Sequence, residues 1–405
     1  MQTLTFDEVL EEFLAGLDED QTISDNRPGV RGVSKSLTRP NTAQSNRQSA
    51  TAPSTGRLLE STMISRQQCY PVKGEENLST EEDKLMSNSL RCQLHAMAPL
   101  IPRFHLFEID DQPWFPSFLR ARVQDALLAT WVNRTPGLQP ASPARLAADI
   151  LEREIGQASL PSHTFIDFCA GSGGPTPTIE RILNRRLAAA SLPAATFVLT
   201  DLHPNPTSWS RAAAASSNLV YEPDPIDASA APPSLLAQHR GSSPVSISSP
   251  SATKKKEKKE IFRLFNLAFH HFPDPLARRI LRDTLSTSSG FAIFELQARE
   301  PASFLACCLL GLGVLVGAPY HAWRLRSWAV LFFCWVIPVL PFVLVFDGLV
   351  SSVRTRTPDE VEALMRTCGA DCEAWEVRSG SDMHLWPVGY LHWIVATKKD
   401  VPGRQ

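Results

Sequence analysis

Apolar and polar positions alternate along the second half of the chain in a pattern that predicts a wound α/β domain. Compact apolar runs mark five predicted strands with their exit loops, at residues 164–170, 195–204, 218–228, 261–272 and 290–298. Stretches with helical spacing separate them, for example 176–190 and 275–289. Strands that alternate with helices in this way are typical of a mostly parallel sheet covered on both faces. We therefore predict an α/β fold with a doubly wound, mostly parallel, Rossmann-like sheet.

The pattern also divides the chain into segments. Residues 1–90 are polar and poor in large apolar side chains, so we predict a mostly disordered N-terminal region. Residues 91–160 carry helical patterns, and Ser142 and Pro143 suit the N-cap and the first position of one helix. We assign them to a helical extension, followed by a core at 161–300 and 351–400. Within the core, a Ser/Pro run and a lysine run predict a disordered insertion at 228–260.

The two halves of this core are separated by an apolar insertion at residues 301–350. Its two longest runs, 304–319 and 328–346, contain no charged residue, and each is near the lower length limit for crossing a bilayer. Arginines and aromatic residues lie between them: Tyr320, Trp323, Arg324, Arg326 and Trp328. This composition is typical of the lipid headgroup interface. We therefore predict a helical hairpin that contacts membrane lipid.

Two arrangements of the hairpin stay open. A hairpin that spans the bilayer would carry Arg324 and Arg326 to the far side, against the tendency of positive loops to stay in the cytoplasm. A shallow hairpin would keep both arginines at the near surface, beside anionic lipid. Either arrangement makes the protein membrane-associated, and we expect the catalytic domain to face the cytoplasm.

Composition narrows the classes of partner. The formal net charge is −2 over 405 residues, so we expect no nucleic acid partner. The eight cysteines form no C-x-x-C pair, and no histidine follows them at the spacing of zinc ligands. We therefore expect no metal site. Cysteines scattered among apolar residues fit a reducing compartment better than a disulfide framework.

Chemically useful residues gather at the predicted carboxyl ends of the strands, where wound sheets bind ligands. The first strand runs into Asp167, Cys169, Ala170, Gly171, Ser172 and Gly173. Glycines there let a ligand approach the backbone closely. The second strand ends at Asp201 and Leu202, the third exits at Asp227 and Ala228, and the fourth ends at Asn266. A carboxylate such as Asp201 can accept hydrogen bonds from both hydroxyls of a ribose.

The glycine turn departs from the dinucleotide fingerprint G-x-G-x-x-G, because Thr176 occupies the third glycine position. The sequence "DFCAGSGG" instead resembles the first motif of class I S-adenosylmethionine-dependent methyltransferases, with Cys169 where a glycine is commoner. "NLAFHHFPDP" is similar to the fourth-strand motif of quinone- and sterol-type members. The resemblance covers residues 161–399, with two insertions, and includes a methyltransferase-like subgroup of unassigned substrate.

The resemblance implies the cofactor S-adenosylmethionine, held by the strand-end residues named above, with Asp201 on the ribose and Asp227 near the adenine. It also implies that the two final strands form an antiparallel pair. We expect a membrane-associated methyltransferase that acts on a small apolar or lipid-like acceptor. The alternative is a non-catalytic membrane adaptor that keeps the fold, because Cys169 departs from the motif and no base is evident.

Two histidines are the only candidates for a catalytic base in these motifs. His270 and His271 follow the predicted fourth strand. If that strand continues through them, their side chains face opposite sides, and one of the two reaches the pocket. Such a base is needed only when the acceptor arrives protonated.

Overall fold

The computed structural model describes residues 101–135, 137–241 and 259–399, all of which belong to one compact unit. The predicted N-terminal disordered region and most of the lysine-rich insertion lie outside the described residues.

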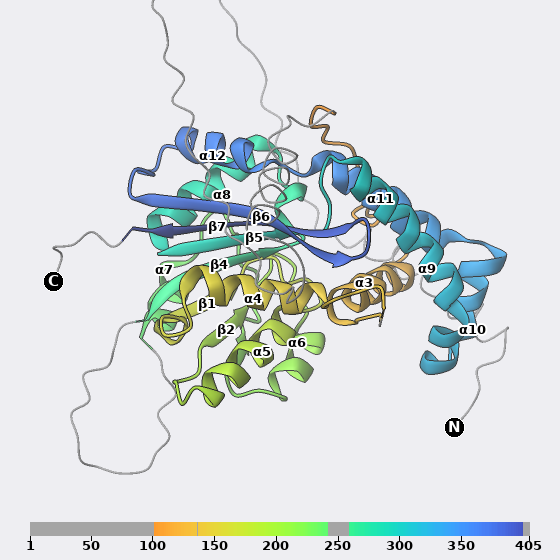
Figure 1. The fold of residues 1–405 in the computed structure, drawn as a ribbon, viewed down its shortest axis with the longest axis horizontal. Coiled ribbons are helices and arrows are strands. Elements are labelled where there is room, and N and C mark those ends of the chain that lie inside the picture. The colour runs from red at the N-terminus through yellow and green to blue at the C-terminus, as the bar shows by residue number, and fades with distance from the viewer. Residues whose placement is uncertain (1–100, 136, 242–258, 400–405) are drawn as a thin grey trace, which may run out of the picture. The chain divides into compact units, whose positions relative to one another are not determined.

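A seven-stranded sheet forms the centre of this unit (Figure 1). Its strands are β1 (His163–Asp167), β2 (Thr196–Leu199), β3 (Leu219–Tyr221), β4 (Glu260–Asn266), β5 (Gly290–Glu295), β6 (Trp375–Leu385) and β7 (Gly389–Lys398). They lie in the order β3-β2-β1-β4-β5-β7-β6. The first five are parallel, whereas β7 is antiparallel to both β5 and β6. The predicted doubly wound sheet with a terminal antiparallel pair is therefore confirmed.

Helices cover both faces of the sheet, because successive strand residues point to opposite sides. Phe165 of β1 packs in a core with α4 (Pro143–Ile155), α5 (Thr176–Ala189) and α6 (Pro206–Ala213). Its neighbour Ile166 packs in a second core with α7 (Pro233–Arg240), α8 (Asp274–Thr287) and α12 (Pro358–Thr367). Burial on both sides explains why the strands read as continuous apolar runs.

Helix starts follow the local sequence signals closely. The backbone N–H of Arg145 donates to the Ser142 side chain, so Ser142 caps α4 as predicted. Thr357 and Glu360 form a capping box at the start of α12, which satisfies two backbone donors at that end.

Two segments differ from prediction. Strand β4 ends at Asn266 as expected, but Phe269–His271 form a short 3-10 helix (η2), so the strand does not continue through the two histidines. Leu267 has φ +54°, a left-handed conformation that breaks the strand. In the insertion predicted to be disordered at 228–260, residues 233–240 form α7, whose Leu235 and Leu236 are buried against β4.

The apolar insertion forms a helical hairpin. Its first arm is α9 (Pro301–Leu325), and its second arm comprises α10 (Trp328–Leu331), a π-helical turn (Phe332–Val336) and α11 (Val339–Arg354). Figure 1 shows α9 and α11 side by side, in line with the close approach of the Val345 side chain to Gly311, where it leaves no room for a Cβ. Residues 301–324 form one helix long and apolar enough to cross a membrane, and the second arm is bent by 66°.

One hydrogen bond between the arms involves a carbonyl that the first arm leaves unpaired. Pro319 has no N–H, so it cannot donate to the carbonyl of Leu315 one turn earlier. The indole Nε1 of Trp335 donates to that carbonyl at 2.9 Å. An unpaired carbonyl is costly where no water reaches it, so this contact favours a hairpin whose two arms stay together.

Candidate functional site

The glycine turn after β1 has the backbone that its sequence suggested. Gly171, Gly173 and Gly174 have φ values of +52°, +111° and +51°, a region that side chains disfavour. A Cβ at Gly171 would meet no atom within 4 Å. The turn is fixed from outside, because Trp209 Nε1 donates to the Gly171 carbonyl at 2.9 Å and Ser208 Oγ to the Ser172 carbonyl at 2.7 Å. The result is a rigid turn with an open approach to its backbone.

Helix α3 (Ser117–Val132) reaches the same turn from the N-terminal side. Ser172 Oγ donates to Gln124 Oε1 of α3 at 2.6 Å. The extension before the sheet therefore belongs to the walls of the site.

The carboxylate at the end of β2 lies beside the glycine turn. Asp201 accepts hydrogen bonds from the backbone N–H groups of Gly171 and His203, each at 2.8 Å. Each oxygen of a carboxylate has two acceptor positions, so both oxygens keep one for a ligand. Leu202 beside it is 54% exposed, which leaves an apolar surface next to the carboxylate.

The loop after β3 joins this edge through the backbone. Ile226 N donates to the Asp201 carbonyl at 2.8 Å, so Asp227 follows directly beside the end of β2. Asp227 is exposed, and its carboxylate accepts from Ser229 N at 2.7 Å. The buried Ala228 turns its carbonyl to the fully buried guanidinium of Arg263, at 3.2 Å.

A buried polar group lies beneath the turn. Asp167 accepts hydrogen bonds from Thr176 Oγ1 at 2.5 Å and from Asn266 Nδ2 at 3.0 Å. Burial raises the pKa of Asp167 to about 6, although these hydrogen bonds oppose the rise. Among the described residues, the buried Oδ1 of Asn266 has no hydrogen-bond partner. Such an atom is costly to leave unpaired, so it is available to a ligand or a water.

The raised pKa of Asp167 predicts a pH-dependent stability. The folded pKa of about 6 exceeds the ordinary Asp pKa of 3.8, so the stability that this group contributes is complete below pH 3.8 and is lost as the pH rises through 6. The loss amounts to about 3 kcal/mol, from 1.36 kcal/mol per pKa unit. Asp167→Asn removes this dependence. In urea unfolding between pH 4.5 and 7, the free energy of unfolding of the variant should therefore rise relative to that of the wild type as the pH increases. Curves that stay parallel, as expected for the exposed control Asp224→Asn, would contradict the assignment.

Cys169 occupies the position where the motif usually has glycine. Its side chain is half-buried. Burial raises the pKa of the thiol well above its ordinary value, and the charges of Asp201 and Asp167 act in the same direction. The group is therefore a neutral thiol at physiological pH.

His270 and His271 do not face opposite sides as predicted, because η2 replaces the strand there. Their rings lie 4.2 Å apart between centroids, and both belong to one polar cluster. His270 is 2% exposed, and its Nδ1 lies 2.7 Å from Glu295 Oε2. His271 Nδ1 lies 3.2 Å from Asp111 Oδ2. Burial alone would lower the pKa of His271, but the hydrogen bond with Asp111 and the charge of Glu108 raise it.

The acidic members of this cluster were missed in the sequence. Glu108 and Asp111 come from the segment before α3, and Glu295 ends β5. The available signal was the acidic run "EIDD" within an otherwise apolar and aromatic stretch, which is unusual for a segment that becomes partly buried.

Two arginines at the end of α11 and just after it are buried. Arg354 is 5% exposed, and its Nη1 lies 2.9 Å from Glu108 Oε1. Arg356 is 7% exposed, pairs with Asp274 at 2.7 Å and lies over the ring of Phe269. Both side chains therefore brace the segment after β4.

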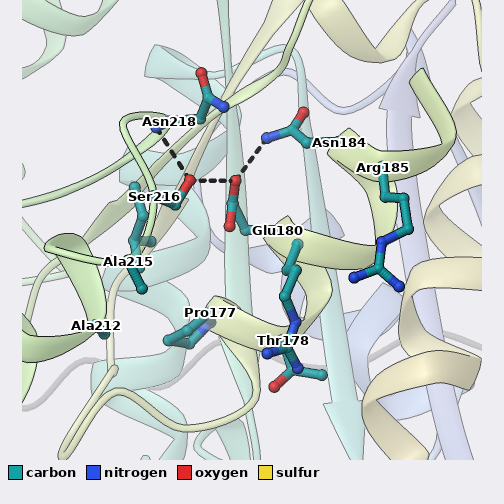
Figure 2. A pocket seen from close by; sticks show the side chains of 11 residues that line it. Pro177, Thr178, Glu180, Asn184, Arg185, Ala212, Ala215, Ser216 and Asn218 are labelled. Atoms are coloured by element: carbon teal, nitrogen blue, oxygen red, sulfur yellow. Dashed lines mark hydrogen bonds between the residues drawn. The ribbon is translucent and has the colours of Figure 1, made fainter. Parts of the chain in front are cut away.

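A hollow of about 410 Å³ lies elsewhere, between α5 and α6 (Figure 2). Figure 2 shows Glu180 accepting hydrogen bonds from Ser216 and Asn184 in its wall. None of the predicted site residues lines it. Because its polar wall groups pair with one another, we assign the hollow no part in the site.

Comparisons with known proteins bear mainly on the fold. No family model matches the chain, and no curated protein sequence matches it. Among solved structures, it is similar to human N-acetylserotonin methyltransferase in complex with SAM (11% identity, TM-score 0.29, covering 63% of this chain and 55% of that one). It is also similar to the Synechocystis magnesium protoporphyrin IX methyltransferase with bound SAH (10% identity, TM-score 0.34, covering 77% of this chain and 95% of that one). A third similar structure is a putative Zn-dependent alcohol dehydrogenase from Rhodobacter sphaeroides (13% identity, TM-score 0.33, covering 69% of this chain and 98% of that one).

These TM-scores are low, so the fold assignment rests on the sheet itself. The wound parallel strands, the glycine turn after β1 and the antiparallel β7 agree with the class I methyltransferase architecture that the sequence resembles. The structure thus has the doubly wound, mostly parallel sheet with a terminal antiparallel pair that this resemblance implies.

Proposed function

We propose that this protein is an S-adenosylmethionine-dependent methyltransferase that works at a membrane on an apolar or lipid-like acceptor. The observation that carries the proposal is the joint placement of the open glycine turn, Asp201 and the Asp227 loop at one edge of the sheet. That edge is where wound sheets bind ligands.

The residues present fit the cofactor. Asp201 keeps acceptor positions for the ribose hydroxyls, Leu202 offers an apolar surface to the adenine, and Asp227 is exposed for its amino group. The left-handed glycines admit the amino acid part of the cofactor, and the unpaired Oδ1 of Asn266 can accept from its ammonium group. The remaining members of the site are Asp167, Cys169, Ala170, Gly171, Ser172, Gly173 and Ala228.

The cofactor supplies an activated methyl group when bound. The chain has to hold the acceptor atom in line with it at about 3 Å and keep competing water away. His270 and His271, at the carboxyl end of β4, are proposed to act on the acceptor side, where a proton has to leave a hydroxyl acceptor.

Exposure of the hairpin supports membrane association. Only 22% of the most apolar window of α9 is buried, unlike a core helix of a soluble domain. Its exposed apolar residues follow one helical stripe: Leu305, Leu309, Leu312 and Val316. Trp323 and Trp328, at the turn between the arms, are more than 70% exposed, as is common at the headgroup level.

Orientation toward the cytoplasm is likewise proposed. The cysteines in the described part of the chain are free thiols: Cys169, Cys307, Cys308, Cys334, Cys368 and Cys372. Free thiols in this number fit a reducing compartment.

Methyl transfer from labelled S-adenosylmethionine to a total lipid extract tests the proposal. We expect the full chain in detergent micelles to label an extractable lipid. Label in added RNA or protein instead of lipid would show that the acceptor belongs to that class and not to the lipids. Cofactor binding without label in any fraction would favour the adaptor alternative, and a folded chain without cofactor binding would overturn the proposal.

A further inference from the structure

We propose that Glu108, His270 and His271 form a binding site for a divalent transition-metal ion, Zn²⁺ in the first instance. This site was not expected from the sequence, because its ligands come from segments far apart and follow no spacing rule.

The geometry brings three electron-pair donors to one point. One ligand atom from each residue lies within 4.8 Å of the others. His271 Nδ1 lies 3.6 Å from Glu108 Oε2, and His270 Nε2 lies 3.8 Å from Glu108 Oε1. The 3.6 Å separation between Nδ1 and Oε2 is close to the distance between neighbouring ligand atoms around a small tetrahedral ion, which follows from metal–ligand bonds of about 2.0–2.2 Å.

Two of the three ligands are already oriented by outer partners. His270 Nδ1 lies 2.7 Å from Glu295 Oε2, so a proton on Nδ1 would satisfy this carboxylate and leave the lone pair on Nε2, the nitrogen that lies nearer Glu108. Glu108 Oε1 accepts from Ser351 Oγ at 2.8 Å and pairs with Arg354 at 2.9 Å, which leaves Oε2 for a metal. A carboxylate behind a ligating histidine is the usual outer shell of metal sites.

The charges of the cluster also favour a bound cation. Glu108, Glu295 and Asp111 are three carboxylates, and Arg354 is the guanidinium that contacts two of them. The side chains of Glu108 and Glu295 are each 6% exposed. A buried excess of negative charge is costly. A divalent ion compensates it, as would protons on both histidines, and the experiment below separates these cases.

Asp111 completes the set. Its Oδ2 lies 3.2 Å from His271 Nδ1, and its side chain is 48% exposed, so it lies at the open side of the cluster and can serve as a fourth ligand. Imidazole and carboxylate together favour Zn²⁺ and its first-row neighbours over Mg²⁺ and Ca²⁺, which prefer oxygen ligands alone.

The position suggests a use. The cluster lies where β4 and β5 end, because His270 follows β4 and Glu295 closes β5. A metal there would anchor an oxygen atom of the acceptor and lower its pKa, so His270 and His271 would then act on the acceptor as metal ligands and not as free bases. This use rests on the proposed function, whereas metal binding itself does not.

Metal titration of the full chain in detergent micelles tests the inference. After chelator treatment, we expect one equivalent of Zn²⁺ to bind. The visible and X-ray absorption spectra of the Co²⁺ form should show mixed nitrogen and oxygen coordination with two imidazoles. Glu108→Gln should weaken Zn²⁺ binding more than 100-fold, and the outer-shell variant Glu295→Gln by about 10–100-fold. His239→Gln is the matched control, since His239 is a buried histidine that lies 2.9 Å from a single carboxylate, Glu222.

The wild-type chain decides the inference even if a variant misfolds. Absence of stoichiometric Zn²⁺ and Co²⁺ binding to the folded wild type would overturn it and favour protonated histidines, as would coordination without imidazole. Equal loss of binding in His239→Gln would also overturn it. Cofactor titration on the same samples keeps the two proposals apart, because the glycine turn binds independently of the cluster.

Discussion

Replacing Asp201 by alanine is expected to weaken binding of S-adenosylmethionine by about 100-fold. The substitution removes two charge-assisted hydrogen bonds to the ribose, each worth about 1.5–3 kcal/mol. Relaxation of the site recovers part of this, so we expect a net loss of binding free energy of about 3 kcal/mol. Isothermal titration on the full chain in detergent micelles measures the effect.

Asp201 also holds the backbone N–H groups of Gly171 and His203, so a second variant is needed. Asp201→Asn keeps one acceptor oxygen and should lose less affinity than alanine. Asp224→Ala removes an exposed carboxylate from the loop after β3 and should bind as the wild type does. Affinities within threefold of one another for all three variants would exclude Asp201 from the cofactor site.

Placing two arginines on the exposed stripe of α9 is expected to release the protein from membranes. Leu312 and Val316 are 55% and 73% exposed and lie one turn apart. A charge near the centre of a bilayer costs about 2.5–3.5 kcal/mol on insertion scales, so Leu312→Arg with Val316→Arg should weaken partitioning by about 5 kcal/mol or more. Vesicle flotation of the full chain measures the bound fraction.

The matched control places an arginine on an exposed position of the sheet, away from the hairpin. Val220 is 38% exposed on the edge strand β3, and Val220→Arg should leave flotation unchanged. If the double variant floats with vesicles as fully as the wild type, the hairpin is not the membrane contact.

Features encoded within a few residues were predictable here. The caps of α4 and α12, the glycine turn and the order of strands and helices follow from turn chemistry and from the period of apolar positions, which act locally. The end of the fourth strand at Asn266 was predicted, but the apolar run "LAFHHF" left open whether the strand continues through the histidines, and Leu267 at φ +54° ends it.

Features that depend on charge compensation were not predictable. Arg354 and Arg356 read as surface residues because arginine is rarely buried, yet Glu108 and Asp274 accompany them into the interior.

The early part of the insertion at 228–260 reads as a polar linker, but Leu235 and Leu236 pack α7 on the sheet.

By itself, the sequence determined the wound sheet, the cofactor-type glycine turn and the apolar hairpin, because periodicity and glycine conformation are properties of neighbouring residues. Only the tertiary structure joined Glu108 and Asp111 to His270, His271 and Arg354, across separations such as the 160 residues between Asp111 and His271. A buried charge needs an opposite charge or a metal within a few ångströms, and it takes that partner from whichever segment the fold brings close.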